Sequence, residues 1–452
     1  MTDDRITARA REIAEQESAR LLERTPASRQ LFERSVKVMP LGVASSFQAG
    51  DPYPIYLREG QGSKVWDVDG NEYVDFHGGF GTMAVGHAHP KVVEAIERAA
   101  RTGTHFAVTT ETTIALAEEL CRRFDLDQVR FANSGTEATM EAIRLARAAT
   151  GRDGIMKIEG SYHGHHDAVM FSVVPNADAM GGREAPASTP LSKGIPAETA
   201  RNTMVVPFND TQALERLLAE RGNEIACLIM EPIMMNIGLA VPEPGYLERA
   251  KELCARHGVI LIFDEVKSGA TVAAGGAAER FGVHPDLSCF AKAVGGGAVL
   301  AAFGGRADLM GQIGRGVAHM GTFNGNPLSA AAGLAALTEV LTAEAYEYLE
   351  KLGTLMAEGC QRAIDDAGIP AHAVDLGAKG CVSYRKEPLR NYRDFLDCNA
   401  ALFEASWPWM VNRSVFMTPG DEEQWTISVQ HSENDVNLYV AAFAEFCQAL
   451  AA

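Results

Sequence analysis

The fold is decided by the run VILIFDEV, residues 259–266, in which five apolar residues lead directly into two acids. Further apolar runs of this kind lie at 129–132, 154–158, 225–230 and 287–291. Segments with helical periodicity separate the runs, at 90–101, 111–123, 136–149, 211–221, 245–257 and 327–342. Continuous apolar strands alternating with helices are typical of a sheet that is buried on both faces. The sequence therefore predicts an α/β fold with a mainly parallel central sheet flanked by helices.

The two ends of the chain differ from this middle region. Residues 5–24 read as a charged helix, whose thin apolar stripe suggests docking on another surface. An Asp-Gly turn between the alternating runs 65–68 and 73–76 predicts a β-hairpin. The segment 175–200 is rich in Pro, Ala, Gly and Ser and reads as a long irregular loop. Beyond about residue 345 the pattern changes to helix, short strands and helix, which suggests a smaller α+β unit.

Composition excludes several classes of function. The 452 residues carry 59 acids against 41 lysines and arginines, a formal charge of −18, and show no basic run. Such a surface repels nucleic acid and anionic lipid. The eight cysteines form no C-x-x-C motif, which disfavours disulfide and zinc frameworks. No apolar stretch reaches membrane-helix length, and the first 25 residues lack the apolar block of a signal peptide. We expect an acidic cytoplasmic protein that binds neither nucleic acid nor membranes.

Polar residues follow the apolar runs, at the positions where an open α/β sheet binds its ligands. They are Ser134, Gly135 and Thr136 at the start of a helix, and then Glu231, Asp264 and Lys292. The carboxyl ends of parallel strands share one edge of a sheet. That edge would therefore present a hydroxyl-rich helix start, two acids and a lysine.

Each of these residues also has a simpler interpretation. Ser134 could be an ordinary helix cap, Asp264 a turn-capping acid, and Lys292 a lysine whose tip reaches solvent. However, a glycine between two hydroxyls at a helix N-terminus is also suited to bind phosphate. A lysine between two alanines and beside the glycines 295–297 is weakly solvated, which favours the neutral amine that Schiff-base chemistry needs.

Taken together, these groups suit pyridoxal phosphate. This cofactor needs a lysine for a Schiff base, an acid against its ring nitrogen, a helix N-terminus for its phosphate and an aromatic ring for stacking. Tyr162 follows the run 154–158 and can supply the ring. The nearby His163, His165 and His166 lack acidic or thiol partners at metal-site spacing, so we predict no metal site. His163 is better interpreted as a support beside Tyr162.

The ordered set of motifs resembles the class III pyridoxal-phosphate-dependent aminotransferases, nearest to the glutamate-1-semialdehyde aminomutase branch. The motifs span Met39 to His431 and include DVDGN at 67–71, GHAHP at 86–90, NSGTEA at 133–138, YHG at 162–164, EP at 231–232, FDEV at 263–266 and GT at 321–322. The resemblance implies a fold-type I homodimer with active sites at the interface. It also implies a large cofactor-binding domain at 86–335 and a small domain built from both chain ends, 1–85 and 336–452.

The resemblance also implies roles for individual residues. Lys292 would form the Schiff base and later move the proton between substrate carbon and cofactor, and Asp264 would pair with the ring nitrogen. Tyr162 and Val266 would cover the two ring faces, while Asn236 would reach the phenolic oxygen. Gly135 and Thr136 would hold the phosphate, joined by Thr322 of the partner subunit. The other expected cofactor contacts are Ser134, His163 and Glu231. Of all these, Lys292, Asp264 and Tyr162 are the expected catalytic residues.

The expected substrate residues depart from the aminomutase pattern. The aminomutases typically carry V-N-S-P-V-R, whose arginine receives the substrate carboxylate, whereas residues 43–48 read VASSFQ. Gln48 therefore replaces a fixed cation. Phe80 replaces the usual tryptophan, and Lys267 begins KSGAT where MTGFR is expected. Glu423 does match the aminomutase's acid near the substrate. We expect Gln48, Phe80, Lys267 and Glu423 to line the pocket, with Lys267 either binding an anion or pointing to solvent.

The predicted activity is ping-pong transamination between an amine or amino acid donor and a keto or aldehyde acceptor. Three alternatives remain open. The same Schiff base supports an intramolecular aminomutase of the glutamate-1-semialdehyde 2,1-aminomutase type, or a racemase. The chain could also bind the cofactor without turnover. A requirement for a separate amino acceptor distinguishes transamination from the other two reactions.

Overall fold

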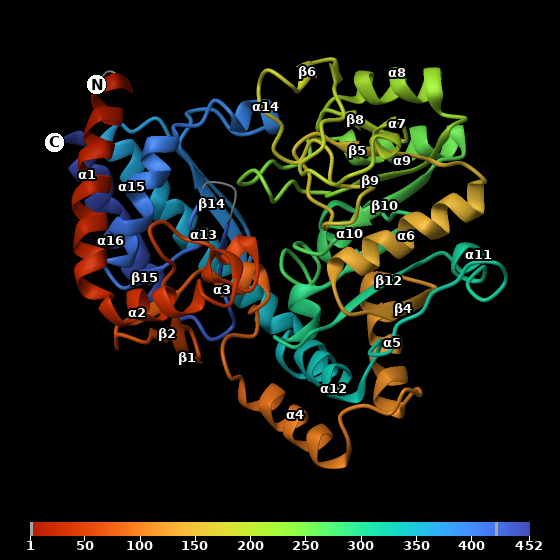
Figure 1. Ribbon diagram of the computed structural model, residues 1–452, viewed down its shortest axis with the longest axis horizontal. Helices are drawn as coiled ribbons and strands as arrows, with labels where there is room; N and C mark the ends of the chain where they lie inside the picture. The colour runs from red at the N-terminus through yellow and green to blue at the C-terminus, as the bar shows by residue number, and fades with distance from the viewer. Residues whose placement is uncertain (1–2, 421–423) are drawn as a thin grey trace.

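The computed structural model describes residues 3–420 and 424–452, and its larger part is built around one seven-stranded sheet (Figure 1). The strand order is β4-β12-β11-β10-β9-β5-β8. The bounds are β4 (Gln128–Ala132), β5 (Gly154–Ile158), β8 (Thr203–Val206), β9 (Ile225–Met230), β10 (Ile260–Asp264), β11 (Leu287–Phe290) and β12 (Ala301–Gly305). β12 runs antiparallel to both of its neighbours, and the other pairings are parallel. The predicted mainly parallel sheet is confirmed, although β8 and β12 were not among the predicted runs.

Helices cover both faces of this sheet, which explains why its central strands β5, β9, β10 and β11 are buried along their whole length. Successive residues of a strand point to opposite faces. In β9, Leu228 packs in the core beneath α8 (Thr211–Arg221) and α9 (Tyr246–His257), whereas Ile229 packs in the core beneath α6 (Gly135–Thr150). The remaining helices of this part are α4 (Pro90–Thr102), α5 (Glu111–Phe124), α7 (Ala197–Arg201), α10 (Gly276–Phe281), α11 (Ala307–Met310) and α12 (Pro327–Ala335), the last continued by the π-helical turn η4 (Ala336–Val340).

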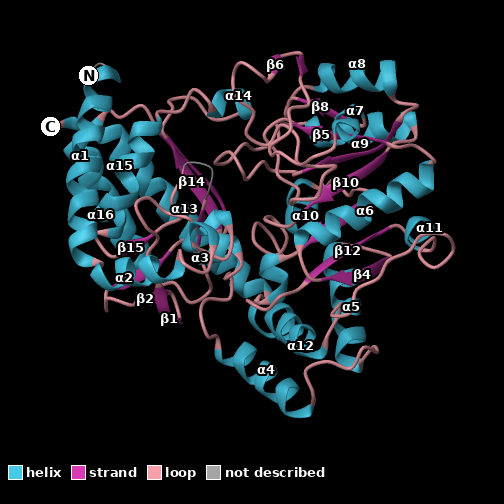
Figure 2. Ribbon diagram, in the orientation of Figure 1, coloured by secondary structure: helices cyan, strands magenta, loops and turns pink. Residues whose placement is uncertain are grey.

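The smaller part combines segments from both chain ends, which lie side by side in Figure 1. Its four-stranded sheet has the order β1-β2-β3-β15, and its three-stranded sheet the order β13-β14-β16. The strands are β1 (Leu57–Gln61), β2 (Lys64–Asp67), β3 (Glu72–Asp75), β13 (His372–Leu376), β14 (Lys379–Ser383), β15 (Val415–Phe416) and β16 (Trp425–Thr426). The helices are α1 (Asp3–Arg24), α2 (Pro26–Ser35), α3 (Gly78–Gly81), α13 (Ala343–Ala367), α14 (Tyr392–Phe395), α15 (Ala400–Val411) and α16 (Glu433–Ala451). Figure 2 shows this mixture of helices and strands.

The contacts within the smaller part confirm an α+β unit built from both chain ends. Ile6 and Ile13 of α1 are buried in one core with residues of α15 and α16. β15, from near the C-terminus, pairs in parallel with β3. The predicted hairpin forms, with Val65 of β2 opposite Tyr73 of β3. The domain boundaries at residues 85 and 335 stay predictions.

The segment 175–200 is irregular, as predicted, apart from the two-residue strands β6 (Gly181–Gly182) and β7 (Ala185–Pro186) and the start of helix α7 at Ala197. The short helix α14, from the C-terminal third of the chain, ties it down. The Tyr392 hydroxyl donates to the Pro175 carbonyl at 3.2 Å. Arg393 binds both carboxylate oxygens of buried Glu159, at 2.9 and 3.0 Å, and also donates to carbonyls at 180–182. This loop is therefore attached to the C-terminal segment as well as to the large sheet.

Three features of the described structure concern membrane spans, metal ligands and cysteines. Within residues 3–420 and 424–452, no single helix is long and apolar enough to cross a membrane; the pair 327–340 and 343–367 passes by length and composition together, but is bent by 77°. In the same ranges, no group of three or more His, Cys, Asp or Glu is arranged to hold a metal ion. All eight cysteines are free thiols.

Candidate active site

The sheet order brings the predicted site residues together. β11, β10, β9 and β5 are consecutive neighbours, so the residues that follow their carboxyl ends lie side by side. One cleft collects nearly all of the expected cofactor contacts, and its lining includes Gly135, Thr136, Tyr162, His163, Glu231, Asn236, Asp264, Val266, Lys267 and Lys292. Residues from five separate stretches of sequence therefore share one cleft.

Lys292 stands directly after β11 in a strained backbone conformation. Its φ is 54°, in the left-handed region that non-glycine residues seldom adopt, and it begins the short helix η3 (Lys292–Gly295). The glycines that follow are needed for packing, since a Cβ on Gly296 would lie 2.7 Å from the Cβ of Ala336. The Lys292 side chain is half-buried and lines the cleft. This placement favours the predicted role of Lys292 over that of an ordinary surface lysine.

Asp264 ends β10 and is held by two contacts. Its Oδ2 lies 2.7 Å from Nδ1 of His163, and its Oδ1 accepts a hydrogen bond from the Val266 amide at 3.0 Å. Both Asp264 and His163 are buried. The other ring nitrogen of His163, Nε2, is buried without a hydrogen-bond partner. His163 therefore supports Asp264 directly, a role that its place beside Tyr162 in the sequence did not show.

Glu231 organises the cleft through three hydrogen bonds. Its buried carboxylate accepts from the Tyr162 amide at 2.9 Å, from Nδ2 of Asn236 at 2.8 Å and from the Met235 amide at 2.9 Å. Burial raises the pKa of Glu231. Burial also raises the pKa of the Tyr162 phenol, which keeps that ring neutral. Glu231 thus positions two expected cofactor contacts.

The start of α6 forms a cradle of small residues. Ser134 caps the helix, accepting from the Glu137 amide at 3.2 Å, so its interpretation as a cap is correct. A Cβ on Gly135 would lie 3.0 Å from Val266, and one on Gly164, whose φ is 93°, would lie 2.5 Å from Thr136 Oγ1. The small residues keep the helix N-terminus open to the cleft. Free amides and a hydroxyl at a helix start suit a phosphate group.

Five predicted residues lie outside this cleft or outside the described chain, and one of them is the helix cap Ser134. Gln48 and Phe80 line a neighbouring hollow rather than the cleft itself. Thr322 is exposed and does not line the cleft of its own chain, and Glu423 lies outside the described residues. Lys267 does line the cleft, and its Nζ donates to the Met235 carbonyl at 2.6 Å, so the solvent-pointing alternative is wrong.

Two important residues escaped the sequence reasoning. Phe47 stands beside Gln48, and its ring packs edge-on against Tyr162 with centroids 5.6 Å apart. Lys157 is fully buried in β5, where Nζ donates to the carbonyls of Ile158, Ser161 and Phe171 at 3.2, 3.0 and 2.7 Å. Burial lowers its pKa to about 7. A lysine inside an otherwise apolar run was the signal that could have identified it.

The donor set fits the predicted pyridoxal phosphate. The cleft offers a half-buried lysine, a buried carboxylate backed by a histidine, a tyrosine ring and an open helix N-terminus. Lys292 would hold the cofactor, Asp264 would face its ring nitrogen, and Gly135 with Thr136 would hold its phosphate. Such a set supports chemistry at the carbon of an amine or amino acid that carries the nitrogen.

Comparisons with known proteins agree with this site. The class III aminotransferase family model matches residues 46–380. The glutamate-1-semialdehyde 2,1-aminomutase of Sorangium cellulosum is 42% identical over 429 residues, 94% of this chain and 96% of that protein. An omega-transaminase from Sphaerobacter thermophilus has a TM-score of 0.89 and 35% identity, covering 95% of this chain and 99% of that one. A transaminase solved with PLP bound has a TM-score of 0.86 and 33% identity, covering 94% and 98%.

Proposed function

The chain belongs to the class III aminotransferase family, and from that premise we propose that it is an aminotransferase that uses a separate amino donor and carbonyl acceptor. Pyridoxal phosphate is its cofactor. The residues around Gln48 favour an aminotransferase with a separate acceptor over an aminomutase. This neutral residue stands where the resemblance expects a carboxylate-binding arginine. Among the described residues that line its hollow, none is a lysine or arginine.

The chain's own residues divide the work of this reaction. Bound pyridoxal phosphate supplies an electron sink for the carbon that carries the amine. Lys292 would hold the cofactor, and Nζ, once freed by the donor amine, would take the proton from the carbon that carries the amine and deliver it to the cofactor. Asp264, oriented by His163, would keep a proton on the ring nitrogen. Tyr162 and Val266, which line the cleft, would cover the two faces of the ring.

A homodimer belongs to the same proposal. Thr322 of the partner subunit would complete the phosphate site, because Thr322 lies outside the cleft of its own chain. The side chains near Thr322 support the proposal that a partner subunit covers this surface. Met320 is 84% exposed and Phe323 is 58% exposed in the isolated chain. Apolar side chains this exposed are typical of a surface that meets another protein.

A second candidate is an intramolecular aminomutase of the glutamate-1-semialdehyde type. The 42% sequence identity to the Sorangium cellulosum aminomutase supports this second function at least as strongly as the fold supports transamination. Lys267 could receive a substrate carboxylate in place of the missing arginine, since it lines the cleft. A racemase has no comparable observation in its favour.

The half-reaction separates these functions. The cofactor-loaded protein is mixed with a donor and no acceptor, and the absorbance change and the carbonyl product are measured. An aminotransferase converts its cofactor to the amine form and releases one carbonyl product per site. An aminomutase given glutamate-1-semialdehyde turns over repeatedly without any acceptor. Repeated turnover of that kind, or no conversion with any donor, would exclude the proposed function.

A further inference from the structure

We propose that the preferred donor carries an aromatic or branched-alkyl side chain and no second carboxylate, and that this side chain lies in the hollow beside the cofactor cleft. The hollow is formed by residues 39–57, 75–87 and 407–419. This inference rests on the proposed aminotransferase function, because it names the substrates of that same site.

The walls of the hollow are rich in aromatic rings. Six of them line it: Phe47, Tyr53, Tyr56, Phe80, Trp407 and Phe416. Its cavity volume is about 640 Å³. Aromatic walls bury a flat or branched apolar group well, and edge-on ring contacts add specificity. The space exceeds what a methyl or ethyl group would fill.

The charges in the hollow disfavour an acidic substrate. Its ionisable lining residues, apart from the tyrosines, are Asp51, Asp75, His77 and His87. Asp75 is already engaged, with Oδ2 2.6 Å from Nε2 of His87 and Oδ1 accepting from the amides of residues 77 and 78. A second substrate carboxylate would meet two acids there, and the described lining residues include no lysine or arginine to pair with it. Like charges repel at short distance, so such a substrate is disfavoured.

Phe47 connects the hollow to the reaction centre. Its ring lies 5.6 Å from that of Tyr162, which lines the cleft, and 6.1 Å from that of Phe80. The Phe80 backbone is left-handed, with φ of 56°, and its ring packs 4.6 Å from that of His77. A substrate whose amine-bearing carbon reaches the cleft at Tyr162 would therefore place its side chain along Phe47 and Phe80.

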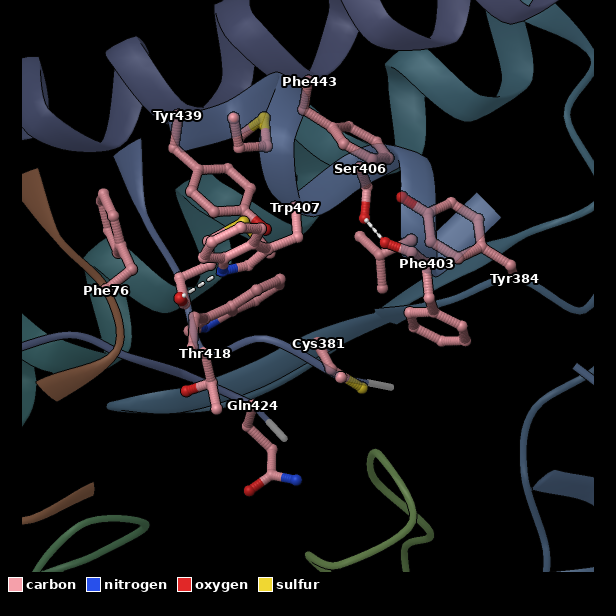
Figure 3. A pocket seen from close by; sticks show the side chains of 15 residues that line it. Phe76, Cys381, Tyr384, Phe403, Ser406, Trp407, Thr418, Gln424, Tyr439 and Phe443 are labelled. Carbon is pink, nitrogen blue, oxygen red and sulfur yellow. Dashed lines mark hydrogen bonds between the residues drawn. The ribbon is translucent and has the colours of Figure 1, made fainter. Parts of the chain in front are cut away.

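One wall residue of the hollow, Trp407, is held by a hydrogen bond. Trp407 lines both the hollow and a second, more enclosed pocket in the smaller part of the molecule, seen in Figure 3. Its indole Nε1 donates to the Met417 carbonyl at 2.9 Å. Figure 3 shows Trp407 among the residues that line this second pocket, with Phe76, Tyr439 and Thr418 also labelled. The hydrogen bond to Met417 orients the indole at the wall of the hollow.

The test uses two pairs of amino donors. Within each pair the amine-bearing group is the same and only the side chain differs. The cofactor-loaded protein is mixed with 1-phenylethylamine or 2-aminopropane, which differ by phenyl against methyl, and with phenylalanine or glutamate. The rate of cofactor conversion at low donor concentration is measured for each. We expect the phenyl donor to react about 100-fold faster than the methyl donor, because one missing methylene in an apolar pocket already costs about 10-fold or more. We expect phenylalanine to react faster than glutamate.

Two variants test whether residues of the hollow determine the donor preference. Phe47→Ala is expected to lower the phenyl-to-methyl rate ratio at least about tenfold, and Gln48→Arg to raise the glutamate-to-phenylalanine ratio by a similar factor. Leu438→Ala, at an exposed leucine on α16, is the control for a generic loss of apolar surface. Equal rates within each donor pair, a preference for glutamate, or unchanged ratios in both variants would overturn the inference while leaving aminotransfer intact. Failure of every donor to convert the cofactor would instead overturn the proposed function.

Discussion

Replacing Glu231 by glutamine tests how the cleft is organised. The carboxylate accepts three hydrogen bonds, from the amides of Tyr162 and Met235 and from Asn236. A glutamine has one acceptor oxygen. In its better orientation that oxygen keeps the two bonds to Tyr162 and Asn236, and its NH₂ group then faces the Met235 amide. At least one buried donor is left unpaired.

The cost follows from these bonds. An unpaired buried donor costs about 1–3 kcal/mol, and each remaining bond weakens by about 1 kcal/mol when the charge is lost. Part of this loss is returned, because burial disfavours the charged form of Glu231 and raises its pKa. We expect Glu231→Gln to lower the free energy of unfolding by about 2 kcal/mol. We also expect pyridoxal phosphate to bind about tenfold more weakly, because Tyr162 and Asn236 lose part of their support.

Two measurements check this prediction. Denaturant unfolding of the cofactor-free protein gives the change in stability, and titration with pyridoxal phosphate gives the change in affinity. Glu97→Gln, at an exposed glutamate of α4, is the matched control and should change stability by less than about 0.5 kcal/mol. If Glu231→Gln matches this control in both measurements, the account of Glu231 as the organiser of the cleft is refuted.

Three further predictions concern the cradle, the buried lysine and the cleft lysine. Gly164→Ala places a methyl 2.5 Å from Thr136 Oγ1 and should weaken cofactor binding about tenfold or more in the same titration, unless Thr136 is not part of the phosphate site. Burial lowers the pKa of Lys157 to about 7, so between pH 7 and 10 the unfolded chain binds its proton more tightly than the folded chain does. The free energy of unfolding of the wild type should therefore rise with pH in this range, by at most about 1.4 kcal/mol per pH unit. This rise should be absent in Lys157→Met. Parallel pH curves would contradict this. Lys267→Ala should raise KM for acidic substrates several-fold; unchanged steady-state values would show that Lys267 binds no substrate anion.

The sequence shows the large sheet because its central strands are buried on both faces, which produces the mainly apolar runs. β12 was missed for a physical reason. It is packed so closely that a Cβ on Gly304 would lie 2.4 Å from the Gln128 carbonyl oxygen, and one on Gly305 2.1 Å from the Asp286 carbonyl oxygen. Small residues are required there, and glycines weaken the strand signal. β8, only four residues long, gives little pattern to recognise.

The site was predictable where it depends on strand order and unpredictable where it depends on loop packing. Lys292 and Asp264 follow adjacent parallel strands, so their proximity was a consequence of the fold class. The contact between His163 and Asp264, at 2.7 Å, joins residues 101 positions apart, and no local pattern encodes it. Gln48 and Phe80 line the hollow beside the cleft, where Phe47 packs against Tyr162, so their expected place in the substrate pocket stays a prediction.

The central claim is that Lys292 holds the cofactor. The most direct measurement is borohydride reduction of the protein loaded with pyridoxal phosphate, which fixes the cofactor covalently to the lysine that carries it, followed by peptide mass mapping. The account predicts the label on Lys292, with neither label nor half-reaction in Lys292→Ala. A label on Lys267, which lines the same cleft, or full activity of Lys292→Ala, would contradict it.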